Sequence, residues 1–282
     1  MDTQAYEATK QWRVNIHKMI STDFMNGYYT YESKRIDIPS TLVESCINHT
    51  VKYSLDELNK LFDLQKSIQF EDGAKIRVRK LECMDLALYY KNKGFNPVLL
   101  NMASASKPGG GYKSGAGAQE ESLFRRTCLH LCLQDKFYPL ELTSGLYTPN
   151  VCVIANNENQ KYAYYDNPHT MNIISMAAYN NNFTNKVKFE LSDQQIQLLT
   201  YEKIDTIFKM AIVNSHDVII LSAFGCGAFK NNPETVATIF KYVIKTNNYD
   251  KYFKHIIFAI IDDYNAKVHG GNYKIFKDIL EN

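Results

Sequence analysis

Residues 97–127 read PVLLNMASASKPGGGYKSGAGAQEESLFRRT and combine an apolar run, a glycine cluster and an acidic pair in one segment. The apolar run at 97–100 predicts a buried strand. Pro108 excludes helix at the residue before it, and the glycines at 109–111 allow positive φ, so a loop follows. A helical pattern then begins at Gln119. Backbone N–H groups in such a loop, and at the start of the helix after it, form a natural anion site.

Glu120 and Glu121 are unusual neighbours for an anion-binding loop, because carboxylates repel anions. They are expected if one of them performs acid/base chemistry on a sugar next to a phosphate. The alternative is an acidic first turn that only complements the helix dipole. Successive residues of a helix are about 100° apart, so we expect the two carboxylates to point in different directions.

Three glycines, seven residues and Gln-Glu-Glu together resemble the signature of poly(ADP-ribose) glycohydrolases. The wider segment 101–126 resembles the smaller, microbial-type branch of that family, which is built on a macrodomain. A second segment, LSAFGCGAFKNNPETVA at 221–237, matches the other loop of the family in the right order. The resemblance covers about residues 75–282.

The resemblance implies hydrolysis of the ribose–ribose O-glycosidic bond of poly(ADP-ribose), which releases ADP-ribose and reverses ADP-ribosylation, as in the DNA damage response. Glu121 aligns with the catalytic glutamate and Glu120 with a ribose ligand. Phe229 aligns with an aromatic residue over the sugar, and Phe224 is expected to pack internally. The remaining implied substrate contacts are Asn101, Ser104, Gly109, Gly110, Gly111, Gln119, Ala223, Gly225, Cys226, Gly227 and Ala228.

Two assignments at this site stay limited. Cys226 has no assignable histidine partner, so we expect a backbone contact there and no nucleophilic thiol. The resemblance also implies an acid that binds adenine, for which Glu82 and Asp85 are the candidates, and the sequence does not choose between them.

Composition narrows the function classes. The chain has 282 residues, 45% of them hydrophobic and 22% charged, and a net charge of +2, so there is no global electrostatic case for nucleic-acid binding. No apolar run approaches the roughly 20 residues of a membrane span.

The six cysteines lack CxxC spacing, and the N-terminus has no apolar signal region, which predicts reduced thiols in the cytoplasm or nucleus. The histidines show no metal spacing. We expect no metal, no cofactor and a monomer that acts on poly(ADP-ribose), ADP-ribose and ADP-ribosylated proteins.

The rest of the chain predicts an α/β fold. We expect a macrodomain-like three-layer α/β/α domain with a mixed central sheet at 75–282, preceded by an α-helical extension at 1–74 that carries no site. Ser54 and Glu57 form a capping-box pattern. The predicted helices are 3–20, 39–46, 54–64, 84–93, 119–134, 191–214, 233–246 and 272–280. The predicted strands are 76–81, 97–102, 151–155, 171–178, 217–223 and 255–261, with a loop at 162–169.

Two alternatives to a poly(ADP-ribose) glycohydrolase remain. One is a macrodomain hydrolase that removes a single ADP-ribose from protein or nucleic acid. The other is a reader that binds ADP-ribose without hydrolysis, and the intact pair Glu120 and Glu121 argues against it. The family implies cleavage mainly from chain ends, and the sequence leaves internal cleavage open.

Overall fold

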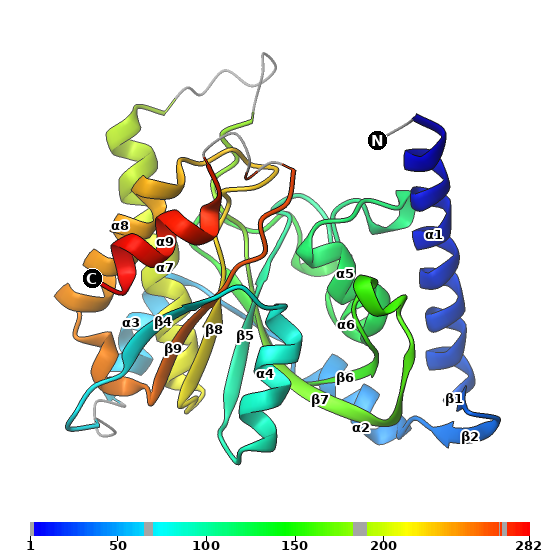
Figure 1. Cartoon of the computed structure of the whole chain (residues 1–282). Coiled ribbons are helices and arrows are strands. Elements are labelled where there is room, and N and C mark those ends of the chain that lie inside the picture. Colours follow the sequence, from blue (N-terminus) through cyan, green and yellow to red (C-terminus); the bar gives the residue numbers. More distant parts are fainter. Residues whose placement is uncertain (1–2, 65–69, 183–190, 265, 267–269) are drawn as a thin grey trace. The chain divides into compact units, whose positions relative to one another are not determined.

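The computed structural model describes residues 3–64, 70–182, 191–264, 266 and 270–282. Contacts divide the chain into two compact units, shown with the whole chain in Figure 1. The first unit comprises Met1–Val51, Ala103–Leu140 and Tyr147–Ile173, and the second comprises Lys52–Met102, Glu141–Leu146 and Ile174–Asn282. The N-terminal helix and the glycine-rich loop belong to the same unit, because they contact each other.

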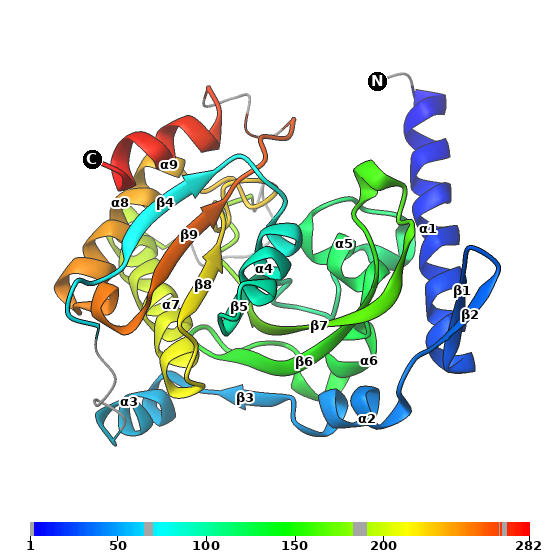
Figure 2. The ribbon, with the colours of Figure 1, turned by 60° about the horizontal axis from the view of Figure 1, so that its bottom comes forward.

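The second unit contains a parallel sheet with helices on both faces. Its strands β5 (Pro97–Met102), β8 (Val218–Leu221), β9 (His255–Ala259) and β4 (Lys75–Arg79) pair in parallel in that order. β8 is buried along its whole length, which explains its continuous apolar sequence. α4 (Cys83–Asn92) covers one face, while α7 (Asp193–Val213) and α8 (Pro233–Thr246) lie on the other (Figure 2). α3 (Leu55–Leu64) contacts α7, and α9 (Asn272–Leu280) contacts α8.

The first unit contains the glycine-rich loop and the helices around it. α1 (Thr3–Asn26) contacts both α5 (Gln119–Arg126) and the short 3-10 helix η1 (Tyr112–Ser114). An antiparallel hairpin of β1 (Tyr28–Tyr31) and β2 (Lys34–Asp37) follows α1. The other elements are α2 (Ser40–Asn48), α6 (Leu129–Cys132), η2 (Asp135–Phe137), η3 (Glu158–Gln160) and most of β6 (Gly145–Ala155) and β7 (Tyr164–Met176).

The predicted fold class is confirmed. Hydrogen bonds join seven strands in the order β3-β6-β7-β5-β8-β9-β4, where β3 is Val51–Tyr53, and helices flank this mixed sheet. The helices predicted at 233–246 and 272–280 and the strand at 97–102 have the predicted bounds. The capping box also forms, since the Ser54 amide donates to Glu57 Oε2 (2.9 Å) and the Glu57 amide donates to Ser54 Oγ (3.3 Å).

Two predicted elements were wrong. The helix expected at 119–134 is two helices, because the chain is extended at Thr127 (φ −138°, ψ 166°), which bridges to Val153. The loop expected at 162–169 is largely strand, since β7 begins at Tyr164. The first error comes from pairing with a strand 26 residues away, which local patterns do not encode.

Candidate active site

The two adjacent glutamates bind the glycine-rich loop through its backbone. Glu120 accepts hydrogen bonds from the Ser104 amide at Oε2 (2.8 Å) and from the Gly109 amide at Oε1 (3.2 Å). Glu121 accepts a hydrogen bond from the Gly111 amide at Oε1 (2.9 Å). The side chains are buried, with 4% of Glu120 and 8% of Glu121 exposed. The loop amides predicted to form an anion site therefore hold carboxylates in this structure.

Gly110 allows this close approach. Its φ is +52°, a left-handed conformation that favours glycine, and a Cβ at this position would lie 2.7 Å from Glu121 Oε1 and 3.3 Å from Glu120 Oε2. Both carboxylates therefore reach the same glycine. They do so although neighbouring residues of a helix are about 100° apart, because glutamate side chains are long.

Tyr138 lies near Glu120 in a segment that pairs with the loop, since the Leu140 amide donates to the Ala105 carbonyl (2.8 Å). The Tyr138 hydroxyl is buried, and no described residue is its hydrogen-bond partner. Burial raises the pKa of Tyr138, and the negative charge of Glu120 raises this pKa further. This hydroxyl therefore remains a neutral donor beside the acidic pair.

The N-terminal helix α1 fixes the far end of the loop. Arg13 donates to both carboxylate oxygens of Glu158 (2.9 and 2.6 Å) and to the Gly115 carbonyl (3.3 Å). A Cβ at Gly115 would overlap the backbone of α1 at Lys10, and a Cβ at Gly117 would overlap the Arg13 guanidinium. These two glycines therefore let the helix rest directly on the loop.

Arg125 extends this network on the buried side of α5. It is fully buried and donates to the Tyr162 hydroxyl (2.8 Å) and to the Ala116 carbonyl (2.7 Å). Its Nη2 lies 3.9 Å from Glu158 Oε2, so Glu158 faces two arginines. Burial opposes ionisation of Glu158, but the hydrogen bond from Arg13 and the charges of both arginines leave its pKa below the ordinary value.

Aromatic contacts connect α1 to the same loop. The His17 ring lies edge-on to Tyr112 of η1, with ring centroids 4.5 Å apart, and 5.4 Å from the His130 ring. Burial lowers the pKa of His17 to about 4, and the positive charges of His130, Arg125 and Lys113 contribute. His17 is therefore neutral near pH 7 and packs as an aromatic side chain.

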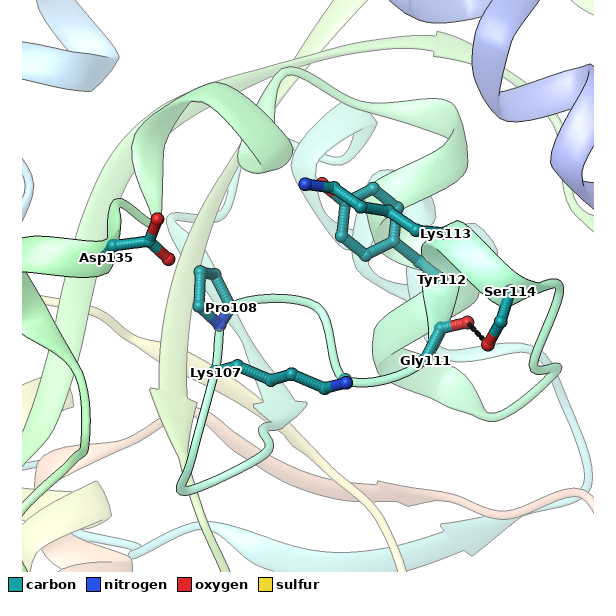
Figure 3. A pocket seen from close by; sticks show the side chains of 8 residues that line it. Lys107, Pro108, Gly111, Tyr112, Lys113, Ser114 and Asp135 are labelled. Atoms are coloured by element: carbon teal, nitrogen blue, oxygen red, sulfur yellow. Dashed lines mark hydrogen bonds between the residues drawn. The ribbon is translucent and has the colours of Figure 1, made fainter.

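A cavity of about 310 Å³ opens along the outside of the loop (Figure 3). Its lining comes from the first unit alone: Lys107, Pro108, Gly110, Gly111, Tyr112, Lys113, Ser114 and Asp135. Lys113 Nζ lies 5.7 Å from the centroid of the Tyr112 ring. Because Gly111 also donates its amide to Glu121, the cavity and the acidic pair share one stretch of backbone.

The second predicted loop follows β8 in the second unit and is held by Asn231. The Asn231 side chain donates to the carbonyls of Tyr179 (2.7 Å) and Gly225 (3.2 Å). Gly225 has φ +74°, and a Cβ there would lie 2.6 Å from Ala178 Cβ, whereas a Cβ at Gly227 would meet no atom within 4 Å. The loop therefore leaves no room for a side chain at Gly225, whereas it leaves room for one at Gly227.

Side chains of this second loop divide as expected. Phe224 is 1% exposed, which confirms it as a packing residue, and Phe229 is partly exposed. Cys226 is buried, and burial raises the pKa of its thiol, so a reactive thiolate is disfavoured. Ala223 is buried and Ala228 is exposed.

The remaining predicted residues lie near the ends of strands and helices or in the loop after β5. Asn101, at the end of β5, is fully buried and donates to Ser175 Oγ (3.0 Å), while its Oδ1 has no partner among the described residues. The Ser104 hydroxyl pairs with Ser106 Oγ (3.3 Å), and Gln119 is the first residue of α5. Glu82 caps α4 by accepting from the Asp85 amide (3.0 Å). Within the described ranges, no three histidine, cysteine or acidic side chains gather as a metal site, and no helix is long and apolar enough to cross a membrane.

Sequence reasoning missed the residues that hold the loop. These residues come from segments more than 30 residues away from the glycine cluster, and no recognisable sequence motif surrounds them: Arg13, Glu158 and Tyr162. Two consecutive arginines at the end of α5 were the available signal, because arginines on an otherwise buried helix need buried acceptors.

A family model matches the segment that contains the glycine-rich loop. The family model described as "Microbial-type PARG, catalytic domain", where PARG is poly(ADP-ribose) glycohydrolase, matches residues 20–156 and so includes α5 and the whole glycine-rich loop. No curated protein sequence matches the chain.

Solved structures of bacterial glycohydrolases share the fold. Poly(ADP-ribose) glycohydrolase from Thermomonospora curvata is 24% identical, with a TM-score of 0.81, over 94% of this chain and 97% of that one. The same enzyme bound to the inhibitor ADP-HPD gives a TM-score of 0.78 at the same identity and coverage. The Deinococcus radiodurans glycohydrolase in complex with ADP-ribose is 22% identical, with a TM-score of 0.74, over 85% of this chain and 97% of that one. Residues 20–156 therefore match the catalytic domain of microbial-type poly(ADP-ribose) glycohydrolases, and the chain shares the fold of the bacterial enzymes.

Proposed function

We propose that this protein hydrolyses ribose–ribose O-glycosidic bonds of poly(ADP-ribose) and releases ADP-ribose, with Glu121 as general acid and base. The observation that carries the proposal is the buried pair of glutamates bound by the glycine-rich loop. A helix start that only needed acidic residues to complement its dipole would leave them exposed. Burying two carboxylates is costly, and a catalytic role accounts for that cost.

Glu121 is suited to transfer a proton. Its Oε1 accepts the Gly111 amide, and no described residue forms a hydrogen bond with its Oε2. One oxygen therefore fixes the orientation of the carboxyl group, and the other can face the substrate. In the complex, the protonated carboxyl gives its proton to the leaving ribose oxygen as the C1″–O bond breaks. The resulting carboxylate then takes a proton from the water that attacks the oxocarbenium-like C1″.

Glu120 has a different environment, which supports a different role. Each of its oxygens accepts one backbone amide, from Ser104 and from Gly109, so its carboxylate joins the two ends of the loop segment 104–109. A carboxylate held in this way can also accept a ribose hydroxyl. Glu120 therefore positions the loop and the sugar.

ADP-ribosylated proteins are the proposed macromolecular substrates.

The test is a Glu121→Gln variant incubated with an automodified polymerase, with products separated by thin-layer chromatography. Glutamine can still accept the Gly111 amide through its carbonyl oxygen, so the loop should stay folded and ADP-ribose should still bind. Turnover should fall at least 1,000-fold, since losing the acid and base in one residue removes the effect of both (about 10²–10⁴-fold each). Glu141→Gln is the matched control, because Glu141 is exposed and paired with Lys52.

Product identity separates the alternatives. Release of ADP-ribose from the polymer supports the proposal. Loss of only the protein-linked unit indicates a mono-ADP-ribosyl hydrolase, and binding without product indicates a reader. Wild-type turnover in the Glu121→Gln variant would remove the mechanism.

A further inference from the structure

The cavity on the outside of the glycine-rich loop is positively charged. Lys107 and Lys113 both line it, both are exposed, and neither forms an ion pair with any described residue. Figure 3 shows Lys107 extending beneath the loop and Lys113 beside the ring of Tyr112. Asp135 is the one carboxylate among the lining residues. Two cations and one carboxylate leave a net positive charge, which suits a phosphate group.

The cavity also lies next to the proposed acid. Gly110 and Gly111 line it, the Gly111 amide donates to Glu121 Oε1 (2.9 Å), and a Cβ at Gly110 would lie 2.7 Å from the same oxygen. A group bound in the cavity is therefore separated from Glu121 by one stretch of glycine backbone. The volume of about 310 Å³ is at the lower end of the range for small-molecule sites, so it suits part of a nucleotide.

We propose that this cavity binds the ADP-ribose unit on the leaving-group side of the scissile bond, with Lys107 and Lys113 on its diphosphate and Asp135 on a ribose hydroxyl. The inference rests on the proposed function. The leaving oxygen is the 2′-oxygen of an adenosine ribose whose 5′-oxygen carries that diphosphate. A cationic cavity beside the proton donor is therefore where the next diphosphate of the chain is expected.

The predicted position of the released unit overlaps the cavity only in part. The sequence resemblance gives that unit contacts in both glycine loops, 109–111 and 223–229, whereas the cavity is lined by residues 107–135 alone. The two lysines should accordingly affect substrates with at least two units and should not affect free ADP-ribose. They would make the enzyme prefer polymer over single ADP-ribose groups.

The experiment measures binding in the Glu121→Gln background, so that the probe is not consumed. Titration calorimetry compares a linear oligomer of three ADP-ribose units with free ADP-ribose, with and without the double substitution Lys107→Ala and Lys113→Ala. Both lysines are exposed, so the variant should fold. Lys136→Ala is the control, because Lys136 is an exposed neighbour of Asp135 that does not line the cavity.

Affinity for the oligomer should fall about ten-fold in the double variant, as expected for two exposed charge contacts. Affinity for ADP-ribose should change less than two-fold, and Lys136→Ala should leave both unchanged. An equal loss for both probes would show that the cavity holds the released unit, and no loss for either would show that it holds neither; both results overturn the inference. A wild-type protein that releases no ADP-ribose from polymer would instead overturn the proposed function, while the binding comparison would still decide the role of the cavity.

Discussion

Gly110→Ala tests whether the glycine-rich loop positions the proposed acid. Gly110 has φ +52°, and a Cβ there would lie 2.7 Å from Glu121 Oε1. The substitution therefore adds two separable effects, a backbone cost and a displacement of the carboxyl group. The first should appear in stability and the second in turnover.

The magnitudes follow from this geometry. A non-glycine residue in the left-handed region costs about 1–2 kcal/mol. An ordinary contact between a Cβ and an oxygen needs at least about 3.4 Å, so the carboxyl group must move by roughly 0.7 Å. A displacement of about 1 Å at a reacting group can reduce the rate by about 10²-fold. We expect kcat to fall about 30- to 100-fold, with a decrease in Tm of a few degrees.

Gly27→Ala is the matched control for the backbone cost. Gly27 has φ +75°, and a Cβ there would meet no atom within 4 Å. This variant should lose similar stability and keep its turnover. Release of ADP-ribose from polymer gives kcat, and thermal unfolding gives Tm. If Gly110→Ala is folded and keeps wild-type kcat, or if both variants lose the same turnover, the loop does not position Glu121.

Two further predictions concern stability. Arg13→Ala should lower the free energy of unfolding in urea by about 1–2 kcal/mol, because it removes a part-buried bidentate pair with Glu158. Arg35→Ala is the control and should lower it by less than about 0.5 kcal/mol, since the pair of Arg35 with Asp37 is largely exposed. Equal losses in the two variants would contradict a role for Arg13 in holding the loop. Burial lowers the pKa of His17 and of His216 to about 4, from 6.5, so unfolding is coupled to proton uptake below pH 6.5. Stability from these residues should be complete above about pH 6.5 and be lost as the pH falls toward 4, and His17→Gln should flatten the dependence of Tm on pH between 7 and 5; an unchanged slope would contradict this.

The sequence predicted the elements whose signals are local. Pro233 at the first turn of α8 and the apolar run of β5 fix those elements without help from the rest of the chain. The hairpin of β1 and β2 was missed, because its turn residues Glu32 and Ser33 both have positive φ without the glycine or asparagine that usually marks such a turn. The break at Thr127 was missed because it depends on a distant strand.

The candidate site shows the same division between local and distant signals. The motif brought the acidic pair and the glycine cluster together correctly, since they are within 13 residues of each other. It could not show that the loop amides bind the carboxylates, because that depends on backbone conformation at Gly109 and Gly110. It also gave no sign that Arg13, about 100 residues earlier, holds the loop.

The contact of α1 with Gly115 and Gly117 has a consequence for how related proteins can diverge. Any side chain at position 115 would meet the main chain of the helix, so shortening a side chain of the helix cannot make room for it. Helix α1 and Gly115 should therefore be inherited or lost as a pair. Relatives that lack the helix would be released from this restriction and could carry a bulkier residue at position 115.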